Sequence, residues 1–416
     1  MKINKENNFP EPDSNGGDKP RLLIILNRFV IGGQAVDTIP LVWHLRSHFH
    51  ILILFGEKEK DELEPDFLLE KYPGLSLIKI KYLCRSINPF NDFLAFIHVY
   101  KAIKNFKADI VHTHGAKSGF IGRLASWLYG VPVIIHTFHG HFFHSYFSKS
   151  MSNFIAGVER TLGKITTAAI ALSNAQKDEL AGKYQILPAD KIQVIPLGFA
   201  FDQENDADSL RQNFRNSFGL QPNDVAVGIV GRIVAVKNHA FFVEVISKVL
   251  AKNVGSNTAF FIVGDGDLRN QVEDDLQKHN IAYNNSGVTG TVRVVFTSWI
   301  TDMYSVMNGL DIVALTSLNE GTPLSVIEAQ FFEKPVISTD AGGVKDSMLH
   351  GVSGYITGTR DIEDFTEKLI RLISDIELRK QMGKAGLEFA SKEFSKKEEI
   401  RATKDFYFSQ LTKKTH

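Results

Sequence analysis

Cysteine is almost missing from this 416-residue sequence, in which Cys84 is the only one. A single thiol cannot form a disulfide within the chain, so the composition is typical of a protein from a reducing compartment. A lone cysteine is more often a small buried residue than a nucleophile, and we assign Cys84 no chemistry.

Long hydrophobic runs and an excess of charge are missing as well. No segment approaches the ~18–20 consecutive apolar residues that cross a bilayer. The first 19 residues are polar, lack the apolar core of a signal peptide and are predicted to be a disordered tail. The 47 basic and 47 acidic residues balance, which argues against a general nucleic-acid binder. We therefore expect a cytoplasmic protein without a nucleic-acid partner.

The charge balance hides an asymmetry between the two halves. Residues 1–199 contain 23 Lys and Arg against 18 Asp and Glu, and the remainder is net acidic. Within 79–123 there are eight basic residues and two acidic ones. This segment predicts a basic patch on the N-terminal half.

The chain repeats a pattern of apolar run, loop and helix. Continuous apolar runs are typical of parallel strands buried on both faces, and their alternation with helical segments such as 92–106 and 118–129 predicts a doubly wound α/β sheet. The predicted strands of the first half are 21–27, 49–55, 75–80, 108–114, 132–138, 167–172 and 192–196.

The same pattern restarts after a polar, acidic stretch near residue 200. Two doubly wound sheets are therefore expected, with a ligand site at the carboxyl ends of their strands, in a cleft between two Rossmann-like domains. The predicted strands of the second half are 224–234, 259–266, 293–299, 310–317 and 334–343. The predicted divisions are a tail (1–19), an N-terminal domain (20–198), a linker (199–210), a C-terminal domain (211–390) and a C-terminal helix (391–416) that could pack back on the first domain.

The segment "NEGTPLSVIEAQ" (319–330) places two acids around the start of a helix. Thr322 is a suitable N-cap, and Pro323 suits the first helical position because its missing N–H costs nothing there. The first turn, with the amides of Leu324 and Ser325, forms a site for an anion such as phosphate. Taken alone, the stretch favours a capped surface helix with two solvated acids.

Two cations follow another predicted strand of the second half. Arg232 and Lys237, in "GIVGRIVAVKNH", could clamp a diphosphate, or they could be solvated surface residues. The nearby "VGDGDL" (263–268) is a tight glycine turn but not a G-x-G-x-x-G fingerprint, so it argues only weakly for a nicotinamide cofactor.

In the first half, a glycine pair and a histidine cluster follow predicted strands. Gly32 and Gly33 at the first strand-to-helix turn would let a ligand approach the backbone. The histidines invite a zinc interpretation, but no cysteine pair and no H-E-x-x-H accompany them, so we expect no metal site. One histidine at a strand end, contacting sugar or phosphate, is the better hypothesis. The cluster consists of His112, His114, His136, His139, His141 and His144.

Taken together, these segments resemble the retaining family-4 glycosyltransferases of GT-B architecture. The resemblance rests on "GIVGRIVAVKN", "FIVGDGDLR", "LDIVALTSLNEGTPLSVIEA", "KPVIST" and "AGGVKD", in this order, and on "GGQA", "VHTHG" and "TFHGHFFH" in the first half. It spans roughly residues 21–395. Glu320 and Glu328 match the family's E-x7-E pair.

The resemblance implies a role for each matched position. Glu328 would accept hydrogen bonds from the nucleotide ribose, and Glu320 would hold hydroxyls of the donor sugar. The stretch Gly321, Thr322, Pro323 and Leu324 would contact sugar and phosphate through its backbone. The remaining roles concern the diphosphate and the reacting sugar: Arg232 and Lys237 would neutralise the leaving group, Gly32 and Gly33 would close over it, and His139 would lie near both.

The implied activity is transfer of a sugar from a nucleoside-diphosphate sugar, expected to be a UDP-sugar, without a metal or other cofactor. The acceptor would be a glycan or a lipid-linked molecule of bacterial cell-surface polysaccharide or glycoconjugate synthesis. A GT-B sugar-nucleotide epimerase and a nucleotide-sugar-binding protein without turnover remain alternatives. Three positions depart from the family pattern: Ser298 and Glu333 stand where glycine is common, and Asp346 where glutamate is.

Membrane contact is a further expectation. The basic segment 79–123 and the aromatic run 141–154 both lie in the N-terminal half. The resemblance implies that this half faces the acceptor. Lysines at an anionic membrane surface each contribute about 1 kcal/mol, so we expect peripheral docking by the N-terminal half without an anchor in the bilayer. The alternative is that the basic residues are ordinary solvated faces and that Phe142, Phe143, Tyr146 and Phe147 belong to the core.

Overall fold

The computed structural model describes residues 19–413, except for 31–32, 60–61, 63, 85, 140–148, 201–205, 253–256 and 290. The chain forms two compact units. Unit 1 comprises residues 1–198 and 396–416, and unit 2 comprises residues 199–395. The last helix therefore belongs to the same unit as the first strand.

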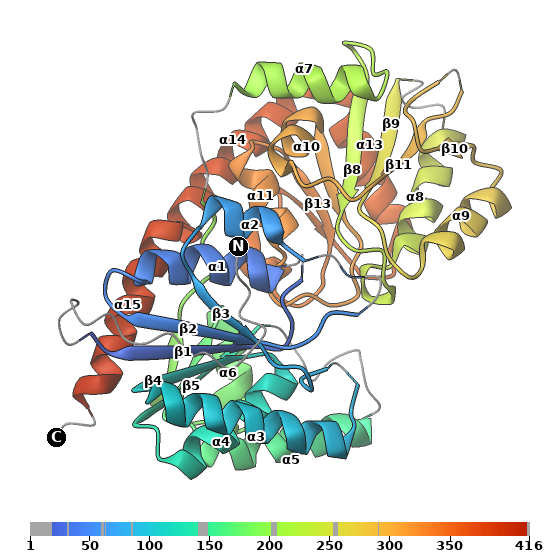
Figure 1. Ribbon diagram of the computed structural model, residues 1–416. Coiled ribbons are helices and arrows are strands. Elements are labelled where there is room, and N and C mark those ends of the chain that lie inside the picture. Colours follow the sequence, from blue (N-terminus) through green and yellow to red (C-terminus); the bar gives the residue numbers. More distant parts are fainter. Residues whose placement is uncertain are drawn as a thin grey trace. The chain divides into compact units, whose positions relative to one another are not determined.

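Unit 1 is built on a seven-stranded parallel sheet in the order β3-β2-β1-β4-β5-β6-β7 (Figure 1). The order reverses at β1 and β4, as in doubly wound folds. The strands are β1 (Arg21–Leu26), β2 (His50–Phe55), β3 (Ser76–Lys79), β4 (Ile110–His114), β5 (Val133–Phe138), β6 (Ala168–Ala171) and β7 (Ile192–Val194).

Helices cover both faces of this sheet because successive β1 side chains point to opposite sides. Leu22 and Ile24 pack with α1, α2 and α15, whereas Leu23 and Ile25 pack with α3 and α4. The helices are α1 (Gly33–Leu45), α2 (Asp66–Lys71), α3 (Pro89–Phe106), α4 (Ala116–Tyr129), α5 (Lys149–Lys164), α6 (Asn174–Asp178) and α15 (Lys396–Thr412), with short turns η1 (Glu179–Lys183) and η2 (Ala189–Lys191).

Unit 2 repeats the architecture with a second seven-stranded parallel sheet in the order β10-β11-β9-β8-β12-β13-β14. Its strands are β8 (Val225–Val230), β9 (Thr258–Val263), β10 (Tyr283–Asn284), β11 (Val294–Ser298), β12 (Ile312–Leu315), β13 (Val336–Thr339) and β14 (Gly354–Thr357). Its helices are α7 (Ala207–Ser217), η3 (Ala235–Lys237), α8 (His239–Ala251), α9 (Arg269–Lys278), α10 (Met303–Gly309), α11 (Leu324–Phe331), α12 (Val344–Ser347), α13 (Ile362–Ser374) and α14 (Ile376–Glu393). The two Rossmann-like sheets expected from the sequence are confirmed.

The predicted strands agree with the observed ones to within a few residues at each end, except that β10 and β14 were not predicted. β10 has two residues and no apolar run, and β14 begins at Gly354, so neither carries the sequence signal of a buried strand. Helix α7 begins at Ala207, inside the segment 199–210 expected to be a linker, and Asp206 caps it by accepting from the amide of Ser209.

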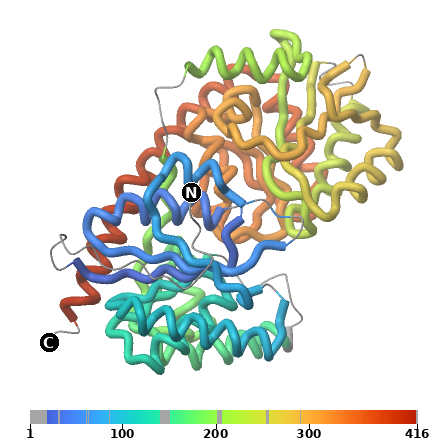
Figure 2. The backbone as a smooth tube through the Cα atoms, in the orientation of Figure 1, coloured from blue at the N-terminus to red at the C-terminus, as the bar shows by residue number. Residues whose placement is uncertain are grey.

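Helix α15 packs on the face of the unit 1 sheet that α1 and α2 also cover. Its Phe406 and Tyr407 lie in the core between β1, α1 and α2, and Figure 2 shows the last helix beside the N-terminal elements of this unit. Lys396, at its start, is buried and donates to Asp37 of α1 at 2.8 Å. A segment that follows unit 2 in sequence therefore completes the core of unit 1.

Within the described part of the chain, the helices are all too short or too polar to cross a membrane.

Candidate functional site

In unit 2, the carboxyl ends of β8, β12 and β13 are neighbours in the sheet and bring the predicted donor-site residues together. The loops after these strands hold one another through their backbones and hydroxyl groups. The amide of Leu318 donates to the carbonyl of Val236, and the hydroxyl of Thr339 donates to the carbonyl of Ser317 at 2.6 Å. The edge is therefore fixed by the protein itself.

Glu320 is bound by Lys237 from the loop after β8. Lys237 Nζ donates to Glu320 Oε1 at 2.7 Å, and Ser317 Oγ donates to the same oxygen at 2.6 Å. Both side chains of the ion pair are largely buried. The pair holds the ammonium group and the carboxylate in fixed positions, and Lys237 and Ser317 both contact the same carboxylate oxygen.

Glu328 lies on α11, five residues into the helix, and is in a different electrostatic environment. Burial raises the pKa of its carboxyl group to about 7, against the opposing effect of Lys237, which lowers it. A carboxyl group with a pKa near 7 is only partly ionised at neutral pH. Hydroxyl groups that donate hydrogen bonds to it would stabilise its charged form. Ribose hydroxyls are donors of this kind.

Helix α11 begins one residue later than the sequence predicts. Pro323 is the N-cap with no side-chain cap hydrogen bond, and Thr322 precedes it, so the prediction of Thr322 as N-cap is wrong. The first helical hydrogen bonds are donated by Val326 and Ile327 to the carbonyl of Pro323. The amides of Leu324 and Ser325 therefore precede the helical ladder at the positive end of the helix dipole.

Gly321 and the loop after β13 are in close backbone contact. The amide of Gly343 donates to the carbonyl of Glu320 at 3.0 Å, and a Cβ on Gly343 would lie 1.6 Å from the carbonyl oxygen of Gly321. Any side chain at 343 would displace the loop that carries Glu320. This glycine is thus required by loop packing.

Arg232 follows β8, two residues beyond its end, and is half-buried. The turn that carries it packs against the glycine loop after β9: a Cβ on Gly264 would lie 2.2 Å from the carbonyl oxygen of Gly231. Gly264 has a φ of 127°, which a side chain would strain. The "GDG" segment therefore supports the turn that carries Arg232.

Two of the three departures from the family pattern have left-handed backbone. Ser298 has a φ of 55° and Glu333 a φ of 53°, so the positions where the family commonly has glycine are positions of positive φ. Ser298 gains a contact in exchange, because its hydroxyl accepts from Arg269 Nη1 at 2.6 Å. Asp346 lies in the four-residue helix α12.

In unit 1, His139 lies directly after β5 and is joined to β4. His139 Nε2 and His114 Nδ1 are 2.8 Å apart, and the rings of His112 and His114 are in tilted contact with centroids 4.1 Å apart. Burial lowers the pKa of His139, while Asp37 opposes this shift. Burial also lowers the pKa of His112 to about 3. These histidines are therefore neutral near pH 7.

The structure places Gly33 at the start of α1, after the carboxyl end of β1. Gly32 lies outside the described residues, as do His141, His144 and the aromatic residues 142–147. The predicted residues thus fall into two sets. Unit 1 carries Gly33 and His139, and unit 2 carries Arg232, Lys237, Glu320, Gly321, Thr322, Pro323, Leu324 and Glu328.

Sequence reasoning missed two groups that support these residues. Ser317 holds Glu320 and could have been suspected from its place three residues earlier in the same loop. Tyr407 of α15 contacts His112 Nδ1 at 2.6 Å, 295 residues away in sequence, and no local signal could reveal this.

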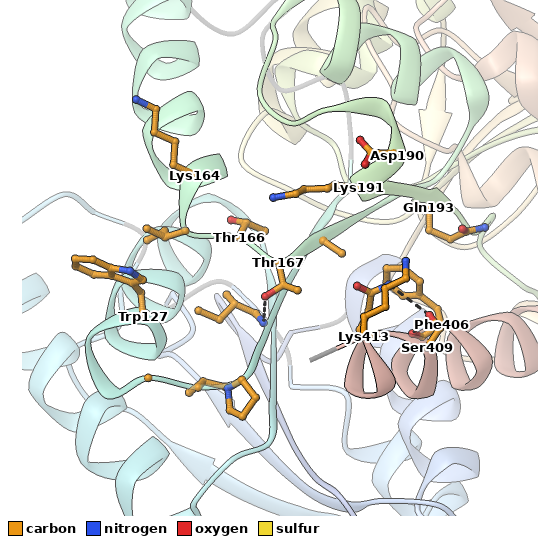
Figure 3. A pocket seen from close by; sticks show the side chains of 17 residues that line it. Trp127, Lys164, Thr166, Thr167, Asp190, Lys191, Gln193, Phe406, Ser409 and Lys413 are labelled. Carbon is orange, nitrogen blue, oxygen red and sulfur yellow. Dashed lines mark hydrogen bonds between the residues drawn. The ribbon is translucent and has the colours of Figure 1, made fainter. Parts of the chain in front are cut away.

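A separate cavity of about 760 Å³ lies at the opposite edge of the unit 1 sheet (Figure 3). It is lined at the amino ends of β5, β6 and β7 and by α15, and it contains none of the predicted site residues. Lys164 and Lys413 lie there at the ends of α5 and α15, where cations complement the helix dipoles. Their helix positions account for these lysines without a ligand.

Comparison with known proteins agrees with this geometry. The Glycosyltransferase Family 4 model matches residues 31–203, and the Glycosyl transferases group 1 model matches residues 211–389. The chain is 32% identical over 293 residues to the UDP-Gal:alpha-D-GlcNAc-diphosphoundecaprenol alpha-1,3-galactosyltransferase of Escherichia coli, covering 70% of this chain and 73% of that protein. It is 24% identical over 325 residues to the capsular polysaccharide biosynthesis glycosyltransferase CapM of Staphylococcus aureus, covering 75% and 79%.

Among solved structures, Anabaena Alr3699/HepE in complex with UDP and glucose superposes with a TM-score of 0.78 at 18% identity, covering 94% of this chain and 100% of that chain. At this identity the likeness shows the fold, which is GT-B. Both halves of the sequence match glycosyltransferase models, and a relative of 32% identity spans most of the chain. The protein therefore belongs to the family-4 glycosyltransferases of GT-B architecture.

Proposed function

We propose that this glycosyltransferase moves a hexose from a UDP-sugar to a glycan or lipid-linked acceptor, with retention of the anomeric configuration, in cell-surface polysaccharide or glycoconjugate synthesis. The observation that carries the proposal is the arrangement at the carboxyl edge of unit 2. The Lys237–Glu320 pair and Glu328 flank the first turn of α11, which is a place for phosphate. The names of the relatives support it, since the Escherichia coli protein uses UDP-Gal and a diphosphoundecaprenol acceptor.

Each half of a nucleotide sugar would meet a suitable group. The ribose hydroxyls would donate to Glu328, and the diphosphate would lie at the start of α11 near Lys237. Because Lys237 and Ser317 both contact Oε1 of Glu320, the hydroxyls of the sugar would donate to Oε2. The carboxylate would thereby orient the sugar and the neighbouring ammonium group together.

The main chemical demand is neutralisation of charge on the leaving diphosphate. Arg232, Lys237 and the amides of Leu324 and Ser325 would stabilise it as the glycosidic bond breaks. We propose that these groups suffice without a divalent metal. The acceptor would attack from the face that the diphosphate leaves, and a leaving phosphate oxygen would take the acceptor's proton. His139, neutral by burial, would donate or accept a hydrogen bond at the sugar or diphosphate.

The decisive experiment is incubation with UDP-, GDP- and ADP-sugars radiolabelled in the sugar, with and without a lipid extract. We expect label to enter the organic phase with one UDP-hexose and only when lipid is present. Interconversion of the free donor sugar in the absence of an acceptor would instead identify an epimerase. Tight UDP binding with no turnover of any donor or acceptor would identify a binding protein.

We also propose that the protein works in the cytoplasm and contacts an anionic membrane as a peripheral protein. Of the eight basic residues in 79–123, Lys79, Lys81, Lys101, Lys104 and Lys107 are exposed. Lys117 and Arg123 instead form ion pairs with acids inside the helix layer. The electrostatic part of the contact would therefore depend mainly on these five lysines, of which Lys101, Lys104 and Lys107 lie on α3 or directly after it.

A further inference from the structure

Bulky apolar side chains are exposed on one helix layer of unit 1. Among the described residues, eight of the fifteen large exposed hydrophobic side chains fall within 87–154. The exposed fraction is 71% for Phe90, 61% for Phe93 and 68% for Phe154. Single exposed apolar residues are ordinary on a protein surface, but a concentration of aromatic ones marks an interaction site.

Most of these side chains lie at the same edge of the sheet. Helices α3, α4 and α5 run antiparallel to the strands that they connect, so each begins at the carboxyl edge (Figure 1). His139, directly after β5, lies at the same edge. We call the exposed apolar side chains near these three helix starts the apolar rim. Its members are Ile87, Phe90, Phe93, Phe120, Met151 and Phe154.

Two ion pairs hold the three helices in register. Lys117, near the start of α4, contacts Asp92 of α3 at 2.5 Å, so the starts of these helices are side by side. Arg123 of α4 donates to both carboxylate oxygens of Glu159 on α5 at 2.8 and 2.9 Å.

The second pair aligns two members of the rim. Phe120 lies three residues before Arg123, and Phe154 lies five residues before Glu159. At a rise of about 1.5 Å per residue, both lie about one turn or slightly more from the ion pair, toward the carboxyl edge. The rim is therefore a row across neighbouring helices.

The same ion pairs remove negative charge from this surface. Helices α3, α4 and α5 contain seven basic and two acidic residues, and the two acids are Asp92 and Glu159. Both are paired, with side chains 24% and 10% exposed. The helix layer thus presents aromatic side chains at one end and basic ones such as Lys101 and Lys104 farther along α3, with its carboxylates neutralised.

We propose that the apolar rim inserts into the interfacial region of an anionic lipid bilayer, and that this insertion presents the carboxyl edge of unit 1 to a lipid-linked acceptor. The proposal rests on the proposed function and adds an apolar anchor to the electrostatic contact. The occupant is a bilayer because the side chains project from helix starts, and because amphipathic surfaces with aromatic and basic residues bind at lipid headgroups. The insertion is reversible and needs no spanning segment.

The test is cosedimentation of the full chain with vesicles of phosphatidylcholine and phosphatidylglycerol, at low and high salt. We expect a substantial bound fraction to remain at high salt. The combined variant Phe90→Ser/Phe93→Ser/Phe154→Ser should lower the vesicle-bound to free ratio at high salt at least tenfold. The variant Lys101→Glu/Lys104→Glu/Lys107→Glu should lose only the salt-sensitive part of the binding.

The matched control replaces three exposed apolar residues of unit 2, as Leu349→Ser/Val352→Ser/Ile376→Ser, whose exposed fractions are 41%, 51% and 55%. This variant should bind vesicles like the unchanged protein. Circular dichroism and thermal unfolding establish that each variant is folded, and Phe93→Trp offers a direct readout, because brominated lipids should quench its emission more than that of the unchanged protein.

Three results would overturn the proposal: vesicle binding that high salt abolishes completely, a rim variant that binds like the unchanged protein, or no added quenching at position 93. Concentration-dependent dimers that the rim substitutions dissolve, in the absence of vesicle binding, would assign the rim to contact between two copies. The vesicles contain neither donor nor acceptor. Their outcome is therefore independent of the transfer assay, which alone decides the proposed function.

Discussion

Two carboxyl groups with seven residues between them, Glu320 and Glu328, have different electrostatic neighbours. Glu320 has an ammonium group at 2.7 Å, whereas burial holds the pKa of Glu328 near 7. Glu320 is therefore the ion-pair partner of Lys237, whereas hydroxyl donors that reach Glu328 would favour its charged form. Binding of a nucleotide at Glu328 should then be coupled to loss of a proton.

The first prediction concerns the affinity for UDP. Replacing Glu328 by Ala should weaken UDP binding by at least about 1 kcal/mol, the scale of a hydrogen bond to a charged group. Isothermal calorimetry of the folded variant measures it. The Glu328→Gln variant is the control for pH, because it has no carboxyl group to ionise at this position. Its affinity for UDP should not rise with pH, whereas that of the unchanged protein should rise as Glu328 ionises. Equal affinities of the Ala variant and the unchanged protein would refute the ribose contact.

The second prediction concerns stability without ligand. The pKa of Glu328 is raised from 4.5 to about 7, so its contribution is fully present below the unfolded pKa and is lost as the pH rises through the folded one. Between these values the unchanged protein should lose about 2–3 kcal/mol relative to Glu328→Gln, at about 1.4 kcal/mol per pKa unit. Urea unfolding at both ends of the window tests this, and parallel pH profiles would contradict it.

At the scale of elements, the ends of helices show where the sequence departs from local preference. Helix α11 is followed at Glu333 by a left-handed residue, a position that glycine adopts without steric cost. In contrast, α3 begins with a favourable pattern, since Asn88 caps it by accepting from the amides of Phe90 and Asn91 at 3.1 Å. Such local differences have measurable effects on stability.

The third prediction follows from the end of α11. The Glu333→Gly variant should raise the free energy of unfolding by about 0.5–1 kcal/mol, because relief of the left-handed strain exceeds the added entropy of the unfolded chain. Glu333→Ala is the matched control and should not stabilise the protein, since alanine keeps the Cβ. Denaturant midpoints compare the three proteins, and a Gly variant no more stable than the Ala variant would show that strain at this residue is negligible.

The fourth prediction concerns the junction of α15 with α1. Lys396 is buried between Asp37 and Glu399, at 2.8 and 2.6 Å. Burial alone would lower the pKa of this lysine, yet the two carboxylates keep it raised. Lys396→Met would leave them without their cation, and we expect a loss of about 3–5 kcal/mol in chemical unfolding. Lys397→Met, at the exposed neighbouring position, should change little. Similar losses of stability in both variants would show that the effect comes from substitution at the start of α15 in general. They would not support a specific effect of removing the buried cation.

Much of the fold and part of the site could be predicted from the sequence. Continuous apolar runs locate the buried strands because both sheet faces are covered, and Glu320 and Glu328 are found because helix-start chemistry is local. The contact of Tyr407 with His112 could not be found, since it joins residues 295 positions apart and depends on tertiary packing. Likewise, the pairing of Lys117 and Arg123 with acids removed them from a patch that sequence alone counts as basic.

At the scale of the whole molecule, charge and chemistry are divided between the units. The donor-site carboxylates and cations lie in unit 2, and the apolar rim and the buried histidines lie in unit 1. We propose that a transferase built in this way stabilises its leaving group with protein charges alone. Its dependence on metal and on those charges is therefore open to a direct test.

The fifth prediction is that transfer activity survives EDTA and depends on two cations. Arg232→Ala and Lys237→Ala should each lower turnover by about 10²-fold or more without unfolding the protein, because both stabilise charge that develops on the diphosphate. Lys252→Ala, an exposed lysine at the end of α8, serves as the control. Loss of activity in EDTA that added divalent metal restores would contradict the metal-free arrangement.

The return of α15 to unit 1 has a consequence for biosynthesis. Ribosomes deliver the chain from its N-terminus, so β1, α1 and the other early elements emerge long before Phe406 and Tyr407, which fill the core beside them. Unit 1 cannot finish folding until all of unit 2 has been translated, although unit 2 is continuous and can fold as it emerges. A nascent chain must therefore keep an incomplete first half from aggregating, and a stop codon within residues 199–395 truncates unit 2 and also removes α15 from unit 1.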